Sequence, residues 1–142
     1  LALFDYVHAR HPNVIVMGRS LGSGVAIRLA TQRPVARLVL ITPYASIAEL
    51  GASQFPMFPV KWLIRDKYES FRYAPRIDVP TLLVVAEHDE IIPRASTDAL
   101  YAAFRPGIAT LRIIPDTGHN TISATPMYVE TLQTALAQNS EQ

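Results

Sequence analysis

Short apolar runs alternate with stretches of helical periodicity along this chain. The apolar runs are candidate strands and cover residues 14–18, 37–42, 81–86 and 109–114. Helical spacing is found over residues 1–10, 21–33, 94–104 and 121–138. Strands that are apolar runs, rather than alternations of apolar and polar residues, are typical of a parallel sheet covered on both faces. The pattern therefore predicts an α/β fold with a parallel sheet of about four strands and flanking helices.

The same pattern predicts that the sheet is incomplete. Right-handed crossovers between four strands in sequence order place all three connecting regions on one face. Only the helix at 121–138 then covers the other face, and the strand at 14–18 is left as a flat apolar edge of a kind that proteins avoid. The chain also begins with Leu1 rather than methionine. We therefore expect residues 1–142 to be one truncated domain whose N-terminal strands are missing, with an upstream segment or a second chain completing the sheet.

Composition narrows the classes of partner and cofactor. With 142 residues, 49% of them hydrophobic, the chain can bury one sizeable core. A charged fraction of 18% and a net charge of +1 provide no strong field, so we expect no nucleic-acid partner. The absence of cysteine excludes disulfides, thiolate catalysis and cysteine–metal sites, and we expect neither a metal nor a cofactor. No apolar run approaches the roughly 18 residues of a membrane span. The sequence does not determine the cellular compartment, although it favours the cytoplasm.

The first strand runs directly into the sequence GRSLG, residues 18–22. A residue between a parallel strand and the following helix lies in the crevice where α/β sheets bind ligands. In a turn this tight we expect strained backbone angles at Ser20, and positions without side chains at Gly18 and Gly22. The pattern is a G-x-S-x-G nucleophile elbow, although a glycine-rich turn that only packs is the alternative. Ser23 is a poorer nucleophile because it falls inside the first helical turn.

A serine needs a base to take its proton and an acid to orient that base. For an elbow of this type the chain order is serine, acid, histidine. His8 and His11 precede Ser20, so His88 and His119 remain. We assign His119 as the base because it follows the last strand, whereas His88 adjoins the best acid and is interpreted as a solvated loop residue.

The acid is expected in VVAEHDEIIP, at the end of the third strand. Asp89 is the first choice because it lies at the mouth of the sheet. Glu90 is the next candidate, and Glu87 is a poorer one because it is closer to the buried strand. Asp116 lies three residues before the histidine and is interpreted as supporting that loop.

Together, GRSLGSG, AEHDEIIP and DTGHN resemble the α/β-hydrolase superfamily, and the match covers essentially the whole chain. The segments ITPYASIAEL and FPMFPVKWLIRDKYES are similar to a branch of small serine hydrolases with membrane-associated and depalmitoylase-like members. The resemblance implies an acyl-enzyme on Ser20 and an oxyanion donor at the backbone N–H of Leu21. The loop that supplies the family's second donor has no counterpart in these residues, so the isolated chain is expected to be inactive.

A lid-like insert is expected at about residues 44–78. It is rich in aromatic residues, and we expect an acyl-binding wall formed by Tyr44, Phe55, Phe58 and Trp62. Core packing explains these aromatics equally well, and contact with a membrane surface is a weaker alternative. The predicted function is hydrolysis of small-molecule carboxylic esters or thioesters through Ser20, Asp89 and His119. A peptidase or amidase with the same triad and a non-catalytic binding domain remain as alternatives.

Overall fold

The computed structural model describes residues 1–46 and 69–138 of the chain. In chain order the elements are α1 (Ala2–His8), β1 (Ile15–Arg19), α2 (Leu21–Gln32), β2 (Arg37–Ile41), α5 (Ser70–Tyr73), η1 (Ala74–Arg76), β3 (Thr81–Ala86), α6 (Arg94–Ala103), β4 (Ala109–Ile114), η2 (Ile122–Ala124) and α7 (Pro126–Ala137). Most of the expected lid-like insert lies outside the described residues. Its last part forms α5 and η1, which pack beside α2 and α6.

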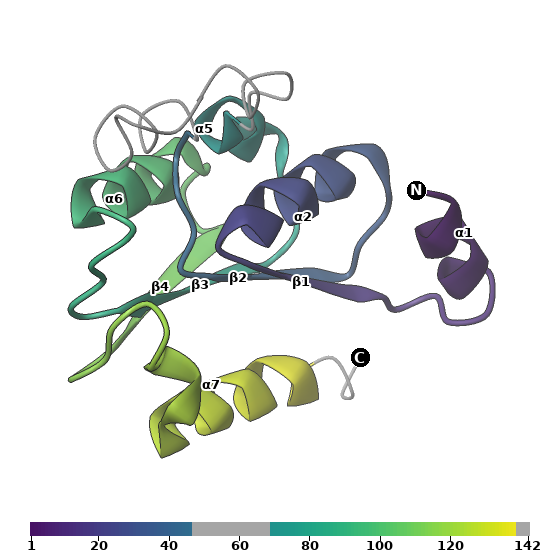
Figure 1. Ribbon diagram of the computed structural model, residues 1–142. Coiled ribbons are helices and arrows are strands. Elements are labelled where there is room, and N and C mark those ends of the chain that lie inside the picture. Colours follow the sequence, from purple (N-terminus) through teal and green to yellow (C-terminus); the bar gives the residue numbers. More distant parts are fainter. Residues whose placement is uncertain (47–68, 139–142) are drawn as a thin grey trace.

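The four strands form one parallel sheet in the order β1-β2-β3-β4, as the apolar runs predict. Gly18 pairs with Leu40, Leu40 with Leu83, and Leu83 with Leu111, so the strands are in close register. Because the strands are parallel, their carboxyl ends meet at the same edge of the sheet (Figure 1). The loops that leave this edge carry the candidate catalytic residues.

Helices cover the sheet unequally. Figure 1 shows α2, α5 and α6 on one face and α7 on the other, which is the arrangement that right-handed crossovers predict. The core under α2 and α6 contains Ile27, Leu38, Leu40, Leu83 and Leu100. The core under α7 contains Val39, Ile41, Val84, Ile114 and Ala135. Successive residues of β2 and β3 alternate between the two cores, so these central strands are buried on both sides and need no polar face.

β1 forms an edge of the described sheet. It pairs with β2 on one side, and Met17 near its centre is 54% exposed. The prediction that upstream strands pair with this edge stays a prediction. Helix α1 lies beyond β1 and is joined to the end of α2 by an ion pair between Asp5 and Arg33 (Figure 1).

The last helix begins later than the periodicity indicates. Residues 122–124 form the short helix η2, and α7 begins at Pro126 instead of near Thr121. Proline is favoured in the first turn of a helix because its missing N–H has no helical partner there. Thr125 caps the helix by accepting a hydrogen bond from the Tyr128 N–H at 3.3 Å.

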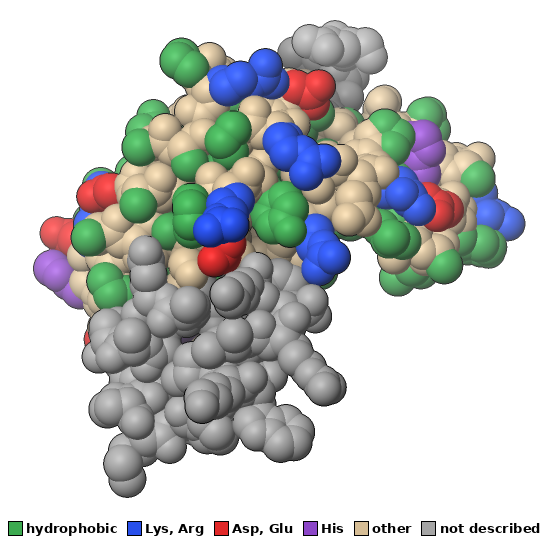
Figure 2. All heavy atoms as spheres, turned by 90° about the horizontal axis from the view of Figure 1, so that it is seen from above, with side chains coloured by type: hydrophobic (Ala, Val, Ile, Leu, Met, Phe, Trp, Pro, Cys, Tyr) green, Lys and Arg blue, Asp and Glu red, His purple; other side chains and the backbone are tan. Residues whose placement is uncertain are grey.

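The molecular surface on the α2 side of the sheet carries no patch of a single charge sign. Figure 2 shows basic, acidic and separate apolar side chains mixed across it. Leu21 and Val25 are the exposed apolar residues of α2, and single exposed side chains of this kind are ordinary on a protein surface. Among the described helices, none has the length and hydropathy required to span a bilayer.

Candidate active site

Ser20 occupies the turn between β1, which ends at Arg19, and α2, which begins at Leu21. Its backbone has φ 50° and ψ −117°, a conformation that residues with a side chain rarely adopt. This confirms the strained backbone expected of an elbow. The Ser20 N–H donates to the Ile41 carbonyl at 2.8 Å, which holds the turn to the neighbouring strand. The Ser20 side chain makes no capping hydrogen bond to α2, so capping does not occupy the hydroxyl that a nucleophile requires.

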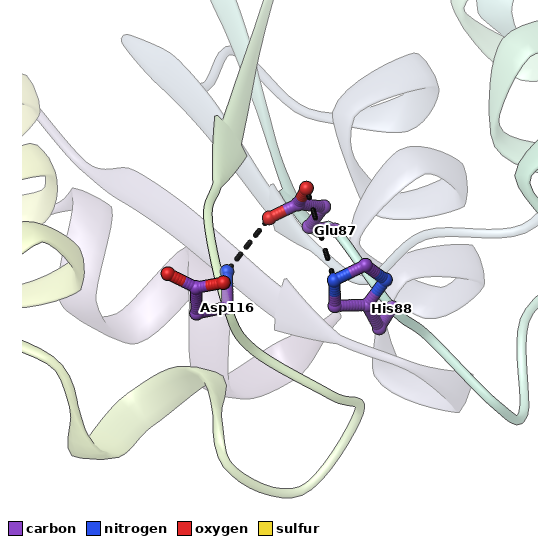
Figure 3. A group of neighbouring side chains, drawn as sticks. All are labelled: Glu87, His88 and Asp116. Atoms are coloured by element: carbon purple, nitrogen blue, oxygen red, sulfur yellow. Dashed lines mark hydrogen bonds and ion pairs between the residues drawn. The ribbon is translucent and has the colours of Figure 1, made fainter.

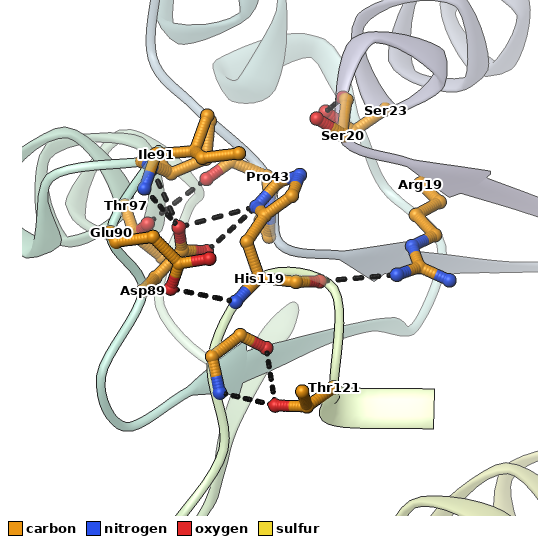
Figure 4. A network of polar contacts seen from close by, with 12 residues as sticks. Arg19, Ser20, Ser23, Pro43, Asp89, Glu90, Ile91, Thr97, His119 and Thr121 are labelled. Carbon is orange, nitrogen blue, oxygen red and sulfur yellow. Dashed lines mark hydrogen bonds and ion pairs between the residues drawn. The ribbon is translucent and has the colours of Figure 1, made fainter. Parts of the chain in front are cut away.

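Ser23 is not placed as a nucleophile. Its side chain is fully buried, and its hydroxyl donates to the Ser20 carbonyl at 2.6 Å. This hydrogen bond stabilises the backbone of the elbow. Figure 4 shows the two serines together at the start of α2.

His119 and Asp89 form a buried pair. The imidazole Nδ1 lies 3.0 Å from Asp89 Oδ2 and 3.2 Å from Oδ1, and the two side chains are 8% and 7% exposed. Asp89 follows β3, and His119 follows β4, so two adjacent strand ends bring them together. In Figure 4 the second ring nitrogen points away from Asp89, toward the side on which Ser20 lies.

The Asp89 carboxylate is itself held by backbone. Its Oδ1 accepts hydrogen bonds from the N–H groups of Ile91 at 2.9 Å and Ile92 at 2.7 Å. This is a local turn in which the aspartate side chain caps the backbone two and three residues ahead. The Asp89 loop therefore fixes the carboxylate independently of the imidazole. The ring is oriented by a rigid hydrogen-bond partner.

The other acidic candidates have different partners. Glu90 Oε2 accepts from the backbone N–H of His119 at 3.2 Å and does not contact the ring. Glu87 is exposed and accepts from the Asp116 N–H at 2.7 Å, while Asp116 has φ 56° in the loop before the histidine. Of the acids considered, Asp89 is the one whose carboxylate meets the His119 imidazole.

His88 lies on the outside of the same region. Its side chain is 69% exposed, and its Nε2 is 3.7 Å from Glu87 Oε1, as expected for a solvated loop histidine. Glu87, His88 and Asp116 could each offer a ligand atom to a metal, and these atoms lie within 4.8 Å of one another (Figure 3). All three residues are exposed. The Glu87–Asp116 hydrogen bond shows that this cluster links the two loops, and we assign it no metal.

One residue of the site escapes sequence reasoning. Arg19, the variable residue before Ser20 in the elbow, donates from its guanidinium to the His119 carbonyl at 3.1 Å (Figure 4). The elbow and the histidine loop are 100 residues apart in the chain and are joined directly by this bond. The G-x-S-x-G pattern accepts any residue at that position, so it carries no signal for the contact.

Comparison with known proteins gives the family. The model of the family described as serine hydrolase (FSH1) matches residues 2–121, which is most of the chain and includes Ser20, Asp89 and His119. The chain belongs to this family. The superfamily resemblance stated from the sequence is thereby confirmed.

Relatives and solved structures are similar to most of this chain. An uncharacterized protein of Mycobacterium tuberculosis is 36% identical over 107 residues, which are 75% of this chain and 38% of that protein. An α/β-hydrolase enzyme from the sediment metagenome of the Mar Chica lagoon superposes with a TM-score of 0.71 at 20% identity, covering 99% of this chain and 68% of the other. A monoacylglycerol lipase of Paleococcus ferrophilus gives a TM-score of 0.67 at 18% identity, covering 96% and 72%.

These likenesses show that the fold is part of an α/β-hydrolase fold, as predicted. The FSH1 chain spans 38% of the length of its curated mycobacterial relative.

The predicted acyl-binding wall is only partly within the described chain. Phe55, Phe58 and Trp62 lie outside the described residues. Tyr44 is fully buried, and its hydroxyl donates to the Leu21 carbonyl at 3.3 Å. This placement favours a packing role beneath the elbow over contact with substrate, because a side chain without exposed surface is not part of an open wall.

The two elbow glycines of this FSH1 chain differ in the space around them. A Cβ at Gly18 would lie 2.4 Å from the Gly22 carbonyl oxygen and 2.8 Å from the Ala26 Cβ. Apart from the neighbouring backbone of α2 itself, a Cβ at Gly22 would meet no described atom within 4 Å. The expectation that both positions must lack a side chain is therefore correct for Gly18 and wrong for Gly22, because the backbone of α2 approaches β1 closely at Gly18 only.

Gly18→Ala is expected to destabilise the protein by roughly 1–3 kcal/mol, because the added methyl group must push α2 away from β1. The matched control Gly22→Ala lies in the first turn of α2 and is expected to be neutral or to stabilise by up to about 1 kcal/mol, since alanine restricts the unfolded chain. Urea denaturation of both variants measures the free energies of unfolding. Equal losses would contradict the close approach at Gly18.

Proposed function

We propose that this chain carries the catalytic residues of a serine hydrolase that cleaves carboxylic esters or thioesters. The observation that carries the proposal is the buried His119–Asp89 pair, 3.0 Å apart, at the same sheet edge as the strained Ser20. A strained residue persists only where its surroundings enforce it, and such residues cluster at functional sites. This argues against the alternative of a binding domain without catalysis.

The pair sets the protonation of the base. When the imidazole donates its Nδ1–H to Asp89, Nε2 has no proton and is left as the acceptor. Nε2 can then take the proton of the Ser20 hydroxyl as the oxygen attacks the acyl carbonyl. The imidazolium that forms is stabilised by the adjacent carboxylate, which remains ionised throughout.

The acyl-enzyme then forms and decays through the same groups. The tetrahedral intermediate collapses as His119 returns the proton to the leaving alcohol or thiol, and the acyl group stays on Ser20 Oγ. Water attacks this ester while His119 takes its proton, and the acid is released as Ser20 recovers its hydrogen. We place the Leu21 N–H, at the start of α2, as a donor to the oxyanion, because free N–H groups at a helix start favour negative charge there.

The substrate class remains part of the proposal. The lipase with a similar fold is named for cleaving an acylglycerol, which is an ester. An amide or peptide could use the same triad but has a poorer leaving group, so we place esters and thioesters first. We propose that Phe55, Phe58 and Trp62 form the apolar wall that sets the acyl preference, without the buried Tyr44.

A fluorophosphonate probe tests the proposal on the purified protein that carries this chain. We expect covalent labelling, with the adduct located by fragmentation mass spectrometry on Ser20 and not on Ser23. A panel of p-nitrophenyl esters of increasing acyl length then reports the acyl preference, and matched thioester and anilide substrates separate the classes. Folded protein that is neither labelled nor active on any of these substrates would contradict the function.

A further inference from the structure

The backbone of His119 is held independently of its ring. Its N–H donates to Glu90 Oε2 at 3.2 Å, and its carbonyl accepts from Arg19 at 3.1 Å. The ring meets Asp89 at 3.0 Å. Figure 4 shows these contacts converging on the histidine from the loop after β3 and from the elbow. Three charged side chains therefore bind three different groups of one residue.

Gly118 makes room for Glu90. A Cβ at Gly118 would lie 2.6 Å from Glu90 Oε2 and 3.4 Å from its Cδ. Among the described glycines, only Gly107 has a positive φ, so the backbone conformation of Gly118 does not itself require glycine. The absence of a side chain at Gly118 leaves room for the carboxylate packed against it, which a Cβ would displace. The hydrogen bond to His119 and the close packing on Gly118 are separate observations that place Glu90 in the same position.

A bond to the ring alone does not fix a general base. With only the Asp89 contact, the imidazole could pivot about Nδ1 as the loop moves, and its second nitrogen would change position. Catalytic groups must be held to about 0.5 Å, and a displacement of about 1 Å can lower the rate about 100-fold. Asp89 and Glu90 are consecutive residues, so a single loop attaches both the ring and the backbone of His119.

We propose that Glu90 is a positioning residue for His119, and that Gly118 is glycine in order to admit its carboxylate. The proposal rests on the proposed function, in which His119 is the base. Glu90 acts through the backbone of the histidine and does not touch the substrate.

Kinetics of Glu90 variants test the role. Glu90→Ala removes the acceptor, and we expect kcat for a p-nitrophenyl ester to fall roughly 10- to 100-fold with KM nearly unchanged. Glu90→Gln keeps a side-chain oxygen that can accept from the His119 N–H, and we expect it to recover most of the activity. The matched control is Glu87→Ala, which removes a carboxylate bonded to a backbone N–H of the same loop, at Asp116. We expect its kcat to stay within about threefold of wild type, since its partner lies outside the triad.

A double-mutant cycle tests the packing. Gly118→Ala alone is expected to lower kcat with little change in the melting temperature, because the new methyl group displaces the flexible end of the Glu90 side chain. In the Glu90→Ala background the same substitution meets no carboxylate, so its effect on kcat should be much smaller. Additive effects would overturn the proposal, as would equal losses of kcat in Glu90→Ala and Glu87→Ala. Wild-type protein without turnover or labelling contradicts the proposed function instead, so the two failures are distinguishable.

Discussion

Ser20→Ala is expected to lower the turnover of an ester substrate by roughly 10⁴- to 10⁶-fold. The substitution removes the hydroxyl oxygen on which we propose that the acyl-enzyme forms, while the proposed oxyanion donor at Leu21 remains. Alanine and serine have similar strain at φ 50°, so the fold of the elbow is expected to be unchanged. Steady-state kinetics with a p-nitrophenyl ester measure the loss, and the melting temperature checks the fold.

The control for this experiment is Ser23→Ala. It also removes a serine hydroxyl from the start of α2, but this hydroxyl is buried and bonded to the Ser20 carbonyl. Fluorophosphonate labelling is expected to persist in Ser23→Ala and to vanish in Ser20→Ala. The reverse result would move the nucleophile to Ser23 and would contradict the elbow as we describe it.

His119→Ala is expected to produce a loss of similar size, again roughly 10⁴- to 10⁶-fold in kcat. Without the imidazole, the proposed mechanism loses the group that accepts the serine proton and returns it to the leaving group. The backbone N–H and carbonyl of residue 119 keep their bonds to Glu90 and Arg19 in this variant. The loss therefore reports the ring and not a collapse of the loop.

His88→Ala is the matched control for the second experiment. Its imidazole is beside Asp89 in sequence, but it is 69% exposed and its nearest ionic partner is Glu87 at 3.7 Å. We expect activity within about twofold of wild type, since substitutions of exposed side chains outside a functional site usually have small effects. Comparable losses in His88→Ala and His119→Ala would show that the base had been misassigned.

Most of the fold could be predicted from local patterns. The four apolar runs are strands within one or two residues of their expected bounds. The reason is clearest for the central strands β2 and β3, which are buried on both faces and are therefore apolar along most of their length. The start of α7 was misplaced, since threonine and isoleucine before Pro126 fit a short 3₁₀ turn as well as an α-helix. Periodicity over so few residues cannot separate the two.

The candidate site was predictable to the level of residue types and strand ends. Glu87, Asp89 and Glu90 are three carboxylates within four positions, and the sequence ranks them only by their position in the loop. In the structure each has a distinct partner: a backbone N–H at Asp116 for Glu87, the imidazole for Asp89, and the histidine backbone for Glu90. Side-chain direction in a loop depends on contacts with another loop about 30 residues away, which no local pattern records.

By itself, the sequence determined the parallel sheet, the elbow at Ser20 and the order along the chain of the proposed nucleophile, acid and base. These depend on short-range properties: burial of apolar runs, the tight turn after a strand, and the shared direction of parallel strands. Only the tertiary structure decided that Glu90 and Arg19 bind the backbone of His119, that Tyr44 lies in the core, and that Gly18 but not Gly22 must lack a side chain. Those outcomes depend on the approach of segments far apart in the chain, whose distances are set by packing of the whole sheet and its helices.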